Sequence, residues 1–164
     1  SGRECRVKFA YMPLPVRQAS PTLRGAQARY RPIVPAHIVA PVMLPPLDAC
    51  IDSAADDTIF PPHLAIRLGI DANSAPTGQV RLVGGTTIKV SYAAVTLLLS
   101  DGYETCEWDA VVGFSAVPMR WALLGHAGFL EFFDVQLLGA HREAILVPSA
   151  NFTGQHLYHV NPVP

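Results

Sequence analysis

Charged residues are scarce in this sequence, and neither sign is in surplus. Only 15% of the 164 residues are charged, and the formal net charge at pH 7 is −1. Proteins that bind nucleic acid through its phosphates usually carry a basic surplus, so we expect no nucleic-acid partner. Half of the residues are hydrophobic, which is enough for a core and argues against a disordered chain. The length favours a single domain.

Long hydrophobic runs and metal-binding motifs are also lacking. No apolar run approaches the roughly 18 residues that a membrane-spanning helix needs, so we expect no membrane partner. The six histidines form no HExxH or other paired spacing, and the three cysteines, Cys5, Cys50 and Cys106, form no CxxC motif. We therefore expect no disulfide framework, no metal and no cofactor. Free thiols are typical of a reducing compartment, so the expected location is cytoplasmic.

Proline, in contrast, is abundant, with 15 residues in the chain. Pro13, Pro15 and Pro21 predict that the N-terminal region is extended or looped, because proline fixes φ and cannot donate a backbone hydrogen bond. From residue 31 the pattern changes to short apolar runs separated by turn signals. We therefore divide the chain into an extended N-terminal segment, one folded domain and a C-terminal tail, over residues 1–30, 31–148 and 149–164.

The folded domain consists mostly of short predicted strands. Residues 33–39 predict a strand that Pro35 restricts to a sheet edge, and residues 47–51 predict a strand that ends at Asp52. Asp101-Gly102 is a strong signal for a hairpin turn. This turn would join strands over residues 86–99 and 104–114, and further strands are expected over residues 79–83, 135–138 and 144–147.

Two short helices are expected between the strands. Residues 61–69 begin with two prolines and end with glycine, which predicts a helix of about two turns. Residues 127–133 carry phenylalanine and leucine at helical spacing, which predicts a second helix with a buried face. The predicted fold class is therefore all-β and barrel-like, with one or two short helices.

Three motifs along this domain resemble one protein family. The letters IDSAADDTIF, at residues 51–60, resemble the signature of the retroviral aspartic proteases, the retropepsins. Nine of the ten positions fit, and Ala54 stands where the family has glycine. The letters WALLGH, at residues 121–126, resemble the second family signature, and GGTTIKV, at residues 84–90, resembles the flap hairpin. The resemblance covers residues 31–148 and is greatest to single-lobe, bacterial or cellular retropepsin-like proteins.

This resemblance implies a function as well as a fold. It implies a retropepsin-like acid-protease half-barrel that is active as a two-fold dimer and hydrolyses a peptide or protein substrate. Hydrolysis by this route needs two facing carboxylates that activate one water molecule. The chain has one such signature, with Asp52 as the catalytic residue, so the second Asp52 would come from another copy in a homodimer.

The resemblance also implies roles for the neighbours of Asp52. Ser53 and Ala54 would belong to the active-site loop, where the Ser53 hydroxyl would brace the paired loops across the two-fold axis. Gly84 and Gly85 would let the flap bend over a bound peptide, because glycine tolerates positive φ. The substrate would be contacted by Ala55, Asp56, Asp57, Gly84 and Gly85.

Other interpretations of these residues stay open. Asp56 could pair with His126, and Gly84-Gly85 could be an ordinary hairpin turn. The chain could also be a catalytically weak or inactive member of the same fold, serving as a peptide-binding or dimerisation module. Residues 149–164 could pair with a partner chain or be disordered, and residues 11–30 could cover the cleft.

Overall fold

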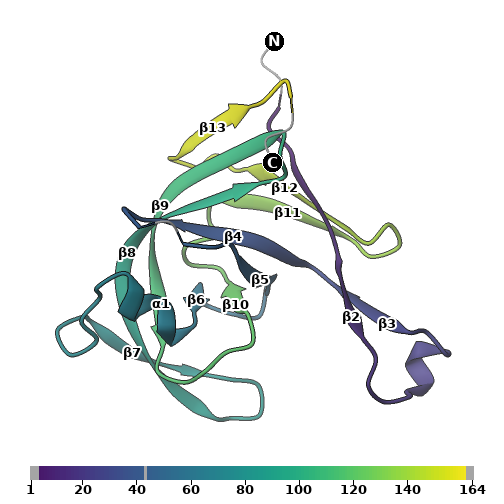
Figure 1. Cartoon of the computed structure of the whole chain (residues 1–164), viewed down its shortest axis with the longest axis horizontal. Helices are drawn as coiled ribbons and strands as arrows, with labels where there is room; N and C mark the ends of the chain where they lie inside the picture. Colours follow the sequence, from purple (N-terminus) through teal and green to yellow (C-terminus); the bar gives the residue numbers. More distant parts are fainter. Residues whose placement is uncertain (1–3, 43, 162–164) are drawn as a thin grey trace.

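The computed structural model describes residues 4–42 and 44–161, and its centre is a closed β-barrel (Figure 1). Six strands follow one another around the ring in the order β9-β6-β10-β5-β4-β8, and β8 pairs back onto β9. The all-β fold predicted from the sequence is therefore confirmed. The six strands are β4 (Ile33–Val39), β5 (Leu47–Ile51), β6 (Ile59–Phe60), β8 (Thr87–Ser100), β9 (Glu104–Ser115) and β10 (Ala122–Leu124).

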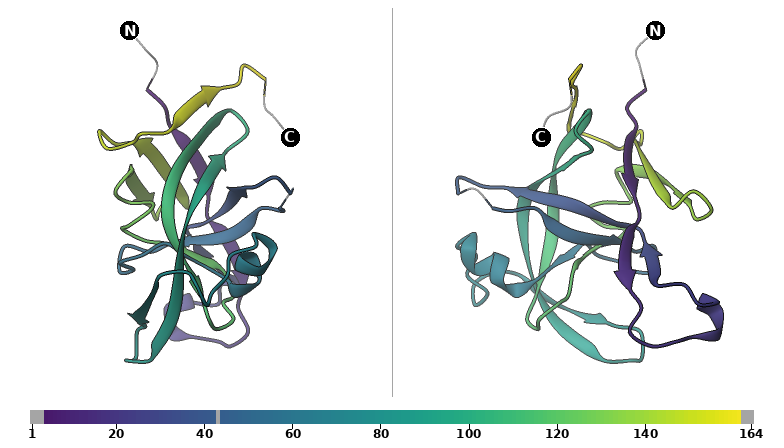
Figure 2. Two further views of the ribbon diagram at one scale, coloured as in Figure 1. Left: turned by 90° about the vertical axis from the view of Figure 1, so that its left-hand side faces the viewer. Right: turned by 45° about the vertical axis from the view of Figure 1, so that its right-hand side comes forward.

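Two further strands extend the barrel sheet, and the remaining strands form two smaller sheets. β7 (Thr77–Arg81) pairs with β8, and β13 (Gln155–Tyr158) pairs with β9. A separate three-stranded sheet has the order β1-β12-β11, and β2 pairs with β3 in an arm that projects from the barrel (Figures 1 and 2). The remaining bounds are β1 (Val7–Ala10), β2 (Met12–Pro15), β3 (Ala28–Arg31), β11 (Phe133–Leu138) and β12 (Glu143–Pro148).

The hydrophobic core fills the barrel and continues to the three-stranded sheet. Trp108 of β9 lies where these two parts meet, with its ring centroid 4.9 Å from that of Phe133 and 6.3 Å from that of Phe129. Its indole Nε1 donates a hydrogen bond of 2.9 Å to the Gly128 carbonyl, so the buried polar atom is satisfied. Trp108 is therefore a core residue that ties β9 to the segment after β10.

The long hairpin of β8 and β9 supplies two neighbouring walls of the barrel. Its turn forms at Asp101-Gly102, as the sequence predicts, because the Asp101 carboxylate accepts the backbone N–H groups of Tyr103 and Glu104 at 2.9 and 2.8 Å. Gly102 has φ of 92°, a value that glycine adopts without a steric penalty.

β4 occupies a different position from the one its proline predicts. The strand lies inside the ring and not at an edge, so that prediction was wrong. Residues 33–36 pair only with β5, whereas residues 37–39 pair only with β8. Pro35 lies in the half of β4 that has only β5 as a neighbour. Its missing N–H therefore removes no hydrogen bond on the side that has no partner strand. The change of partner within one strand forms a corner of the barrel.

One of the two predicted helices is present. α1 (Pro62–Arg67) begins after Pro61 and is followed by Gly69 with φ of 69°, as the sequence pattern indicates. Ala127 instead forms an isolated bridge with Asp57, and residues 128–132 form consecutive turns before β11, so the second helix was a wrong prediction. Gly128 has φ of 86°, which interrupts a right-handed helix, and Leu130 N–H bonds to the Gly125 carbonyl. None of the helices in the described residues is long and apolar enough to span a bilayer.

The two terminal segments pack against the domain between them. β1 pairs with β12 and buries Cys5, Val7 and Phe9, while the β2–β3 arm extends away from the barrel. In the tail, residues 155–158 are ordered and pair with β9 of their own chain. β1 and β13 lie at the same end of the molecule (Figure 2). The proposed boundaries at residues 30 and 148 stay predictions.

Candidate active site

Asp52 is held at the end of a central barrel strand. β10 runs parallel to β5 and places Leu124 beside Ile51. Asp52 N–H donates to the Leu124 carbonyl at 3.0 Å, and Asp52 Oδ1 accepts the N–H of Ala54 at 2.9 Å. The Asp52 carbonyl accepts the N–H of Ala55 at 3.2 Å, which closes a tight turn. The carboxylate is therefore fixed in orientation by its own loop and half-buried at the surface.

The methyl group of Ala54 fits this turn without backbone strain. Among the described residues, only Arg24 and Arg142 combine a positive φ with a side chain. Ala54 therefore lies outside the left-handed region, where a side chain costs about 1–2 kcal/mol. Alanine in place of the signature glycine therefore introduces no backbone strain into the loop. The Ala54 methyl group forms part of the cavity wall beside Asp52.

A second loop, which begins at Gly125, packs against the Asp52 loop. Gly125 follows β10, and a Cβ atom there would lie 2.3 Å from the Asp57 carbonyl oxygen and 2.6 Å from that of Ala55. Gly125 N–H donates to Thr58 Oγ1 at 3.2 Å, and Thr58 is fully buried. Gly125 is thus required by the close approach of two backbone segments, which explains the glycine of the second signature.

A cavity of about 350 Å³ opens beside Asp52. One wall is the loop from Asp52 to Asp57, and the opposite wall is residues 79–83 at the end of β7 and the following turn. None of its described lining residues comes from residues 11–30, so the N-terminal segment does not line this cavity. The structure brings Asp52, Ala54, Ala55, Asp56 and Asp57 together around one space.

Gly84 and Gly85 form the turn of the hairpin that contributes this opposite wall. Their φ angles are 97° and 87°, and a Cβ atom on either would meet nothing within 4 Å. Leu82 N–H bonds to the Thr86 carbonyl at 2.7 Å and closes the turn. The two glycines are therefore at the hairpin tip and not on the cavity wall, while Val83 is fully exposed beside them.

Ser53 and His126 meet at the outer side of the Asp52 turn. His126 Nε2 lies 3.0 Å from the Ser53 carbonyl oxygen, and the His126 N–H donates to the Ala55 carbonyl at 2.9 Å. The alternative in which His126 pairs with the Asp56 carboxylate is therefore not the arrangement in the structure. Asp56 is exposed, and its carbonyl instead accepts the N–H of Ala127 at 2.8 Å.

Tyr92 is a member of the site that sequence reasoning missed. Its hydroxyl donates to Asp57 Oδ2 at 2.7 Å. Burial raises the pKa of Tyr92 to about 12, and the hydrogen bond to Asp57 and its negative charge act in the same direction. Because the two residues are 35 positions apart and belong to different parts of the fold, no local pattern connects them. The bond fixes one Asp57 oxygen, which leaves the other for a ligand.

Neither family models nor curated proteins match this sequence. Among solved structures, the chain is similar to the crystal structure of a retropepsin-like aspartic protease from Rickettsia conorii, with a TM-score of 0.54 and 14% identity. The alignment covers 91% of this chain and 97% of that chain. The likeness therefore extends over most of both chains. The chain has a retropepsin-like fold.

Proposed function

We propose that the protein is an aspartic endopeptidase that acts as a homodimer, with Asp52 from each copy at the active centre. The observation that carries this proposal is the fixed Asp52 turn, with its carboxylate beside a cavity that the β7–β8 hairpin bounds on the other side. The retropepsin-like fold supports the same function, because the similar protein from Rickettsia conorii is described as a retropepsin-like aspartic protease.

The chemistry explains why two copies are needed. One carboxylate accepts a proton from the attacking water, and the other donates a proton to the carbonyl oxygen of the scissile peptide. Two carboxyl groups in contact cannot both ionise, so they share a proton and titrate as a pair. Each chain contributes one such turn in its described residues, and a two-fold axis would place the second carboxylate opposite the first.

The remaining residues of the cavity would bind the peptide. Ala55, Asp56 and Asp57 line the same wall as Asp52, where their polar groups can contact a substrate backbone. The hairpin tip with Gly84 and Gly85 would close over the peptide and exclude water from the reacting atoms. The proposed reaction uses only the two carboxylates and the water between them.

An Asp52→Asn variant tests the proposal, because asparagine keeps the shape of the side chain and removes the carboxylate. Cleavage of a peptide library is measured between pH 4 and 7, and we expect a loss of roughly 10⁴-fold. Asp48→Asn is a matched control, since Asp48 is exposed on the strand that leads to Asp52, and it should retain activity. Equal activity of wild type and Asp52→Asn, or equal inertness, contradicts the proposal.

A second candidate function is a non-catalytic peptide-binding or dimerisation module of the same fold. The observation that favours it is the Ala54 methyl group in the cavity wall, because it narrows the space next to Asp52. This function predicts that peptides from the library bind without turnover, and that Asp52→Asn leaves their affinity unchanged. Equilibrium binding measured beside the cleavage assay separates the two functions.

A further inference from the structure

Three side chains with metal-binding chemistry converge at the end of the barrel remote from Asp52. Cys5 precedes β1, Glu104 begins β9, and His156 belongs to β13, while Cys106 of β9 lies beside Cys5. Gly113, whose N–H bonds to Thr58 beside the Asp52 loop, lies nine residues further along β9 than Glu104. At about 3.3 Å per strand residue, the two places are roughly 30 Å apart. The cluster is therefore distinct from the candidate active site.

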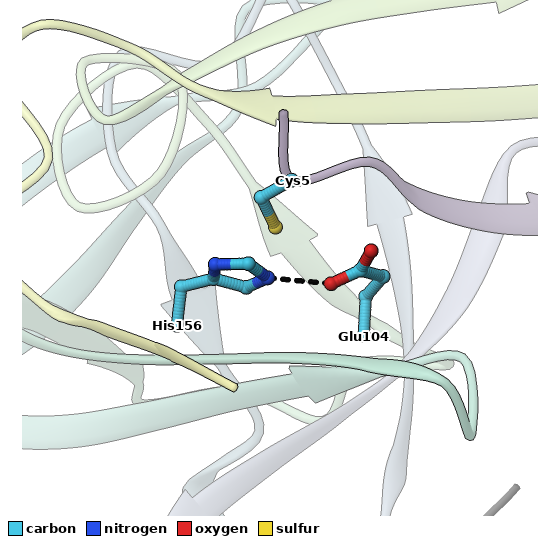
Figure 3. A group of neighbouring side chains, drawn as sticks. All are labelled: Cys5, Glu104 and His156. Carbon is cyan, nitrogen blue, oxygen red and sulfur yellow. Dashed lines mark hydrogen bonds and ion pairs between the residues drawn. The ribbon is translucent and has the colours of Figure 1, made fainter. Parts of the chain in front are cut away.

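The strand register explains why these side chains meet. Glu104 and Cys106 are two residues apart in β9 and share one face, and His156 is paired directly with Cys106. Figure 3 shows the Cys5 thiol pointing toward the gap between the His156 imidazole and the Glu104 carboxylate. Ligand atoms of Cys5, Glu104 and His156 all lie within 4.8 Å of one another.

Two contacts define the cluster more closely. The Sγ atoms of Cys5 and Cys106 are 3.5 Å apart, and His156 Nε2 is 2.5 Å from Glu104 Oε2. A disulfide requires about 2.05 Å between sulfur atoms, so the two cysteines are not bonded and Cys5 keeps a free thiol for a metal ion.

The burial of the cluster suits a bound cation. Cys106 is fully buried, Cys5 is 8% exposed, and the Glu104 side chain is 3% exposed. The His156 side chain is 30% exposed and forms the rim through which an ion would enter. A buried carboxylate is costly to desolvate, and a bound divalent cation would offset that cost.

We propose that Cys5, Glu104 and His156 bind one divalent cation of the Zn²⁺ type. Thiolate and imidazole donors select zinc over calcium or magnesium, and three protein donors leave the fourth position of a tetrahedral ion for water. The Cys106 thiol lies beside Cys5 and would pack against the site without being a ligand. Binding releases the thiol proton of Cys5 to solvent as the metal–sulfur bond forms.

The test uses the full chain, reduced, stripped of metal and kept free of oxygen. Titration with Co²⁺ should give one equivalent bound, with a near-ultraviolet thiolate-to-cobalt charge-transfer band that Zn²⁺ then removes. His156→Asn should weaken Co²⁺ binding at least 10-fold, in the range seen when metal-site partners are lost. Cys5→Ser should remove the band, because Cys5 supplies the one thiolate donor of the site. Cys50→Ser is the matched control, because Cys50 lies on β5 outside the cluster, and should bind as wild type does.

Several results would overturn the proposal. Among them are the absence of a charge-transfer band, and cobalt binding of unchanged affinity in both Cys5→Ser and His156→Asn. Circular dichroism identifies any variant that fails to fold. The partly exposed position of His156 at the rim makes His156→Asn the variant to rely on if a cysteine variant does not fold. A preparation that binds no Co²⁺ after all three thiols are shown to be reduced also excludes the site.

Discussion

Two small residues in the Asp52 region differ in what their surroundings permit. Ala54 carries a methyl group without strain because its φ is not positive, and the space beside it is open cavity. Gly125 has no such freedom, because a Cβ atom would approach two backbone carbonyl oxygens closer than any real contact allows. Ala54 therefore replaces the glycine of the retropepsin signature at a position that accepts a side chain. Gly125, in contrast, lies at a position that has no room for one.

Gly125→Ala should destabilise the protein by about 1–3 kcal/mol, because the added methyl group must push the Ala55 and Asp57 backbone apart. Urea-induced unfolding followed by tryptophan fluorescence measures the change. Gly139→Ala is the control, since Gly139 has no neighbour within 4 Å and no positive φ. Equal stability of the two variants would show that the Asp52 loop is not braced as described.

Tyr92 should ionise at a higher pH than an ordinary tyrosine, because its pKa is raised to about 12. In a spectrophotometric titration, Tyr92→Phe should remove the step at about pH 12, and Asp57→Asn should move that step downward. A raised pKa in the folded state stabilises the protein below the unfolded value of about 10, and this contribution is lost as pH rises through 12.

The same linkage predicts how stability responds to alkali. The urea midpoint of wild type should exceed that of Tyr92→Phe below about pH 10, and the difference should shrink as pH approaches 12. A difference in midpoint that stays constant over this interval would mean that the pKa of Tyr92 is not raised in the folded protein.

At the scale of elements, the hairpin of β7 and β8 joins a regular sheet to a glycine tip. Gly84 and Gly85 both have positive φ, and nothing crowds them. The tip can therefore move without breaking packing, while residues 79–83 below it stay on the cavity wall. Such an element is suited to opening and closing over a ligand.

Gly84→Ala should lower the proposed peptidase activity, because a side chain in the left-handed region costs about 1–2 kcal/mol and disfavours the present turn. Hydrogen exchange of the Leu82 amide, which bonds to Thr86, should become faster. Gly25→Ala is a matched control, since Gly25 has φ of 79° and open space but lies in the arm. If both variants lose activity equally, the tip has no special part in the reaction.

The sequence predicts those elements whose signals are local. The strand before Asp52, the Asp101-Gly102 turn and α1 all follow from neighbouring residues, and all three are present. The second helix fails because apolar spacing over residues 127–133 does not reveal that Gly128 adopts a positive φ. β4 is inside the ring because its partner changes along its length, which proline alone cannot indicate.

The candidate functional residues also separate into those that a local sequence pattern predicts and those that it does not. Asp52 and its loop are readable because a short string of residues carries them, and the structure gathers five of those residues around one cavity. Tyr92 and the cluster of Cys5, Glu104 and His156 are not readable, because strand pairing joins residues separated by 35 to more than 100 positions. Only the closed barrel specifies these neighbours.

At the scale of the whole molecule, the tail limits how two copies can meet. β13 pairs with β9 of its own chain, so this edge of β9 is not open to a strand from a second copy. A proposed dimer must therefore form through other surfaces, with the Asp52 turns facing each other across its axis.

The homodimer proposal predicts a particular result when wild type is mixed with Asp52→Asn. After equal amounts are unfolded together and refolded, random pairing leaves about one quarter of the dimers with two carboxylates. Activity should therefore fall to about one quarter of that of wild type alone at the same total concentration. Independent monomers would retain about half.

Dilution provides a second measurement of the same assembly. Specific activity should decline as the protein is diluted below the dimer dissociation constant, in step with the loss of dimer in sedimentation velocity. Activity that stays constant while the protein is monomeric would contradict the paired-carboxylate mechanism.

The insertion of β10 between β5 and β6 has a consequence for how the protein is made. The Asp52 turn is anchored to Leu124, which follows it by roughly 70 residues in the chain, and is braced by Gly125 beside it. During synthesis, the signature emerges from the ribosome long before its anchor exists, because residues are added at only about 5–20 per second. A nascent chain that has not reached Gly125 lacks the anchor and the brace of the Asp52 turn, so the proposed active centre can form only after that part of the chain has been made.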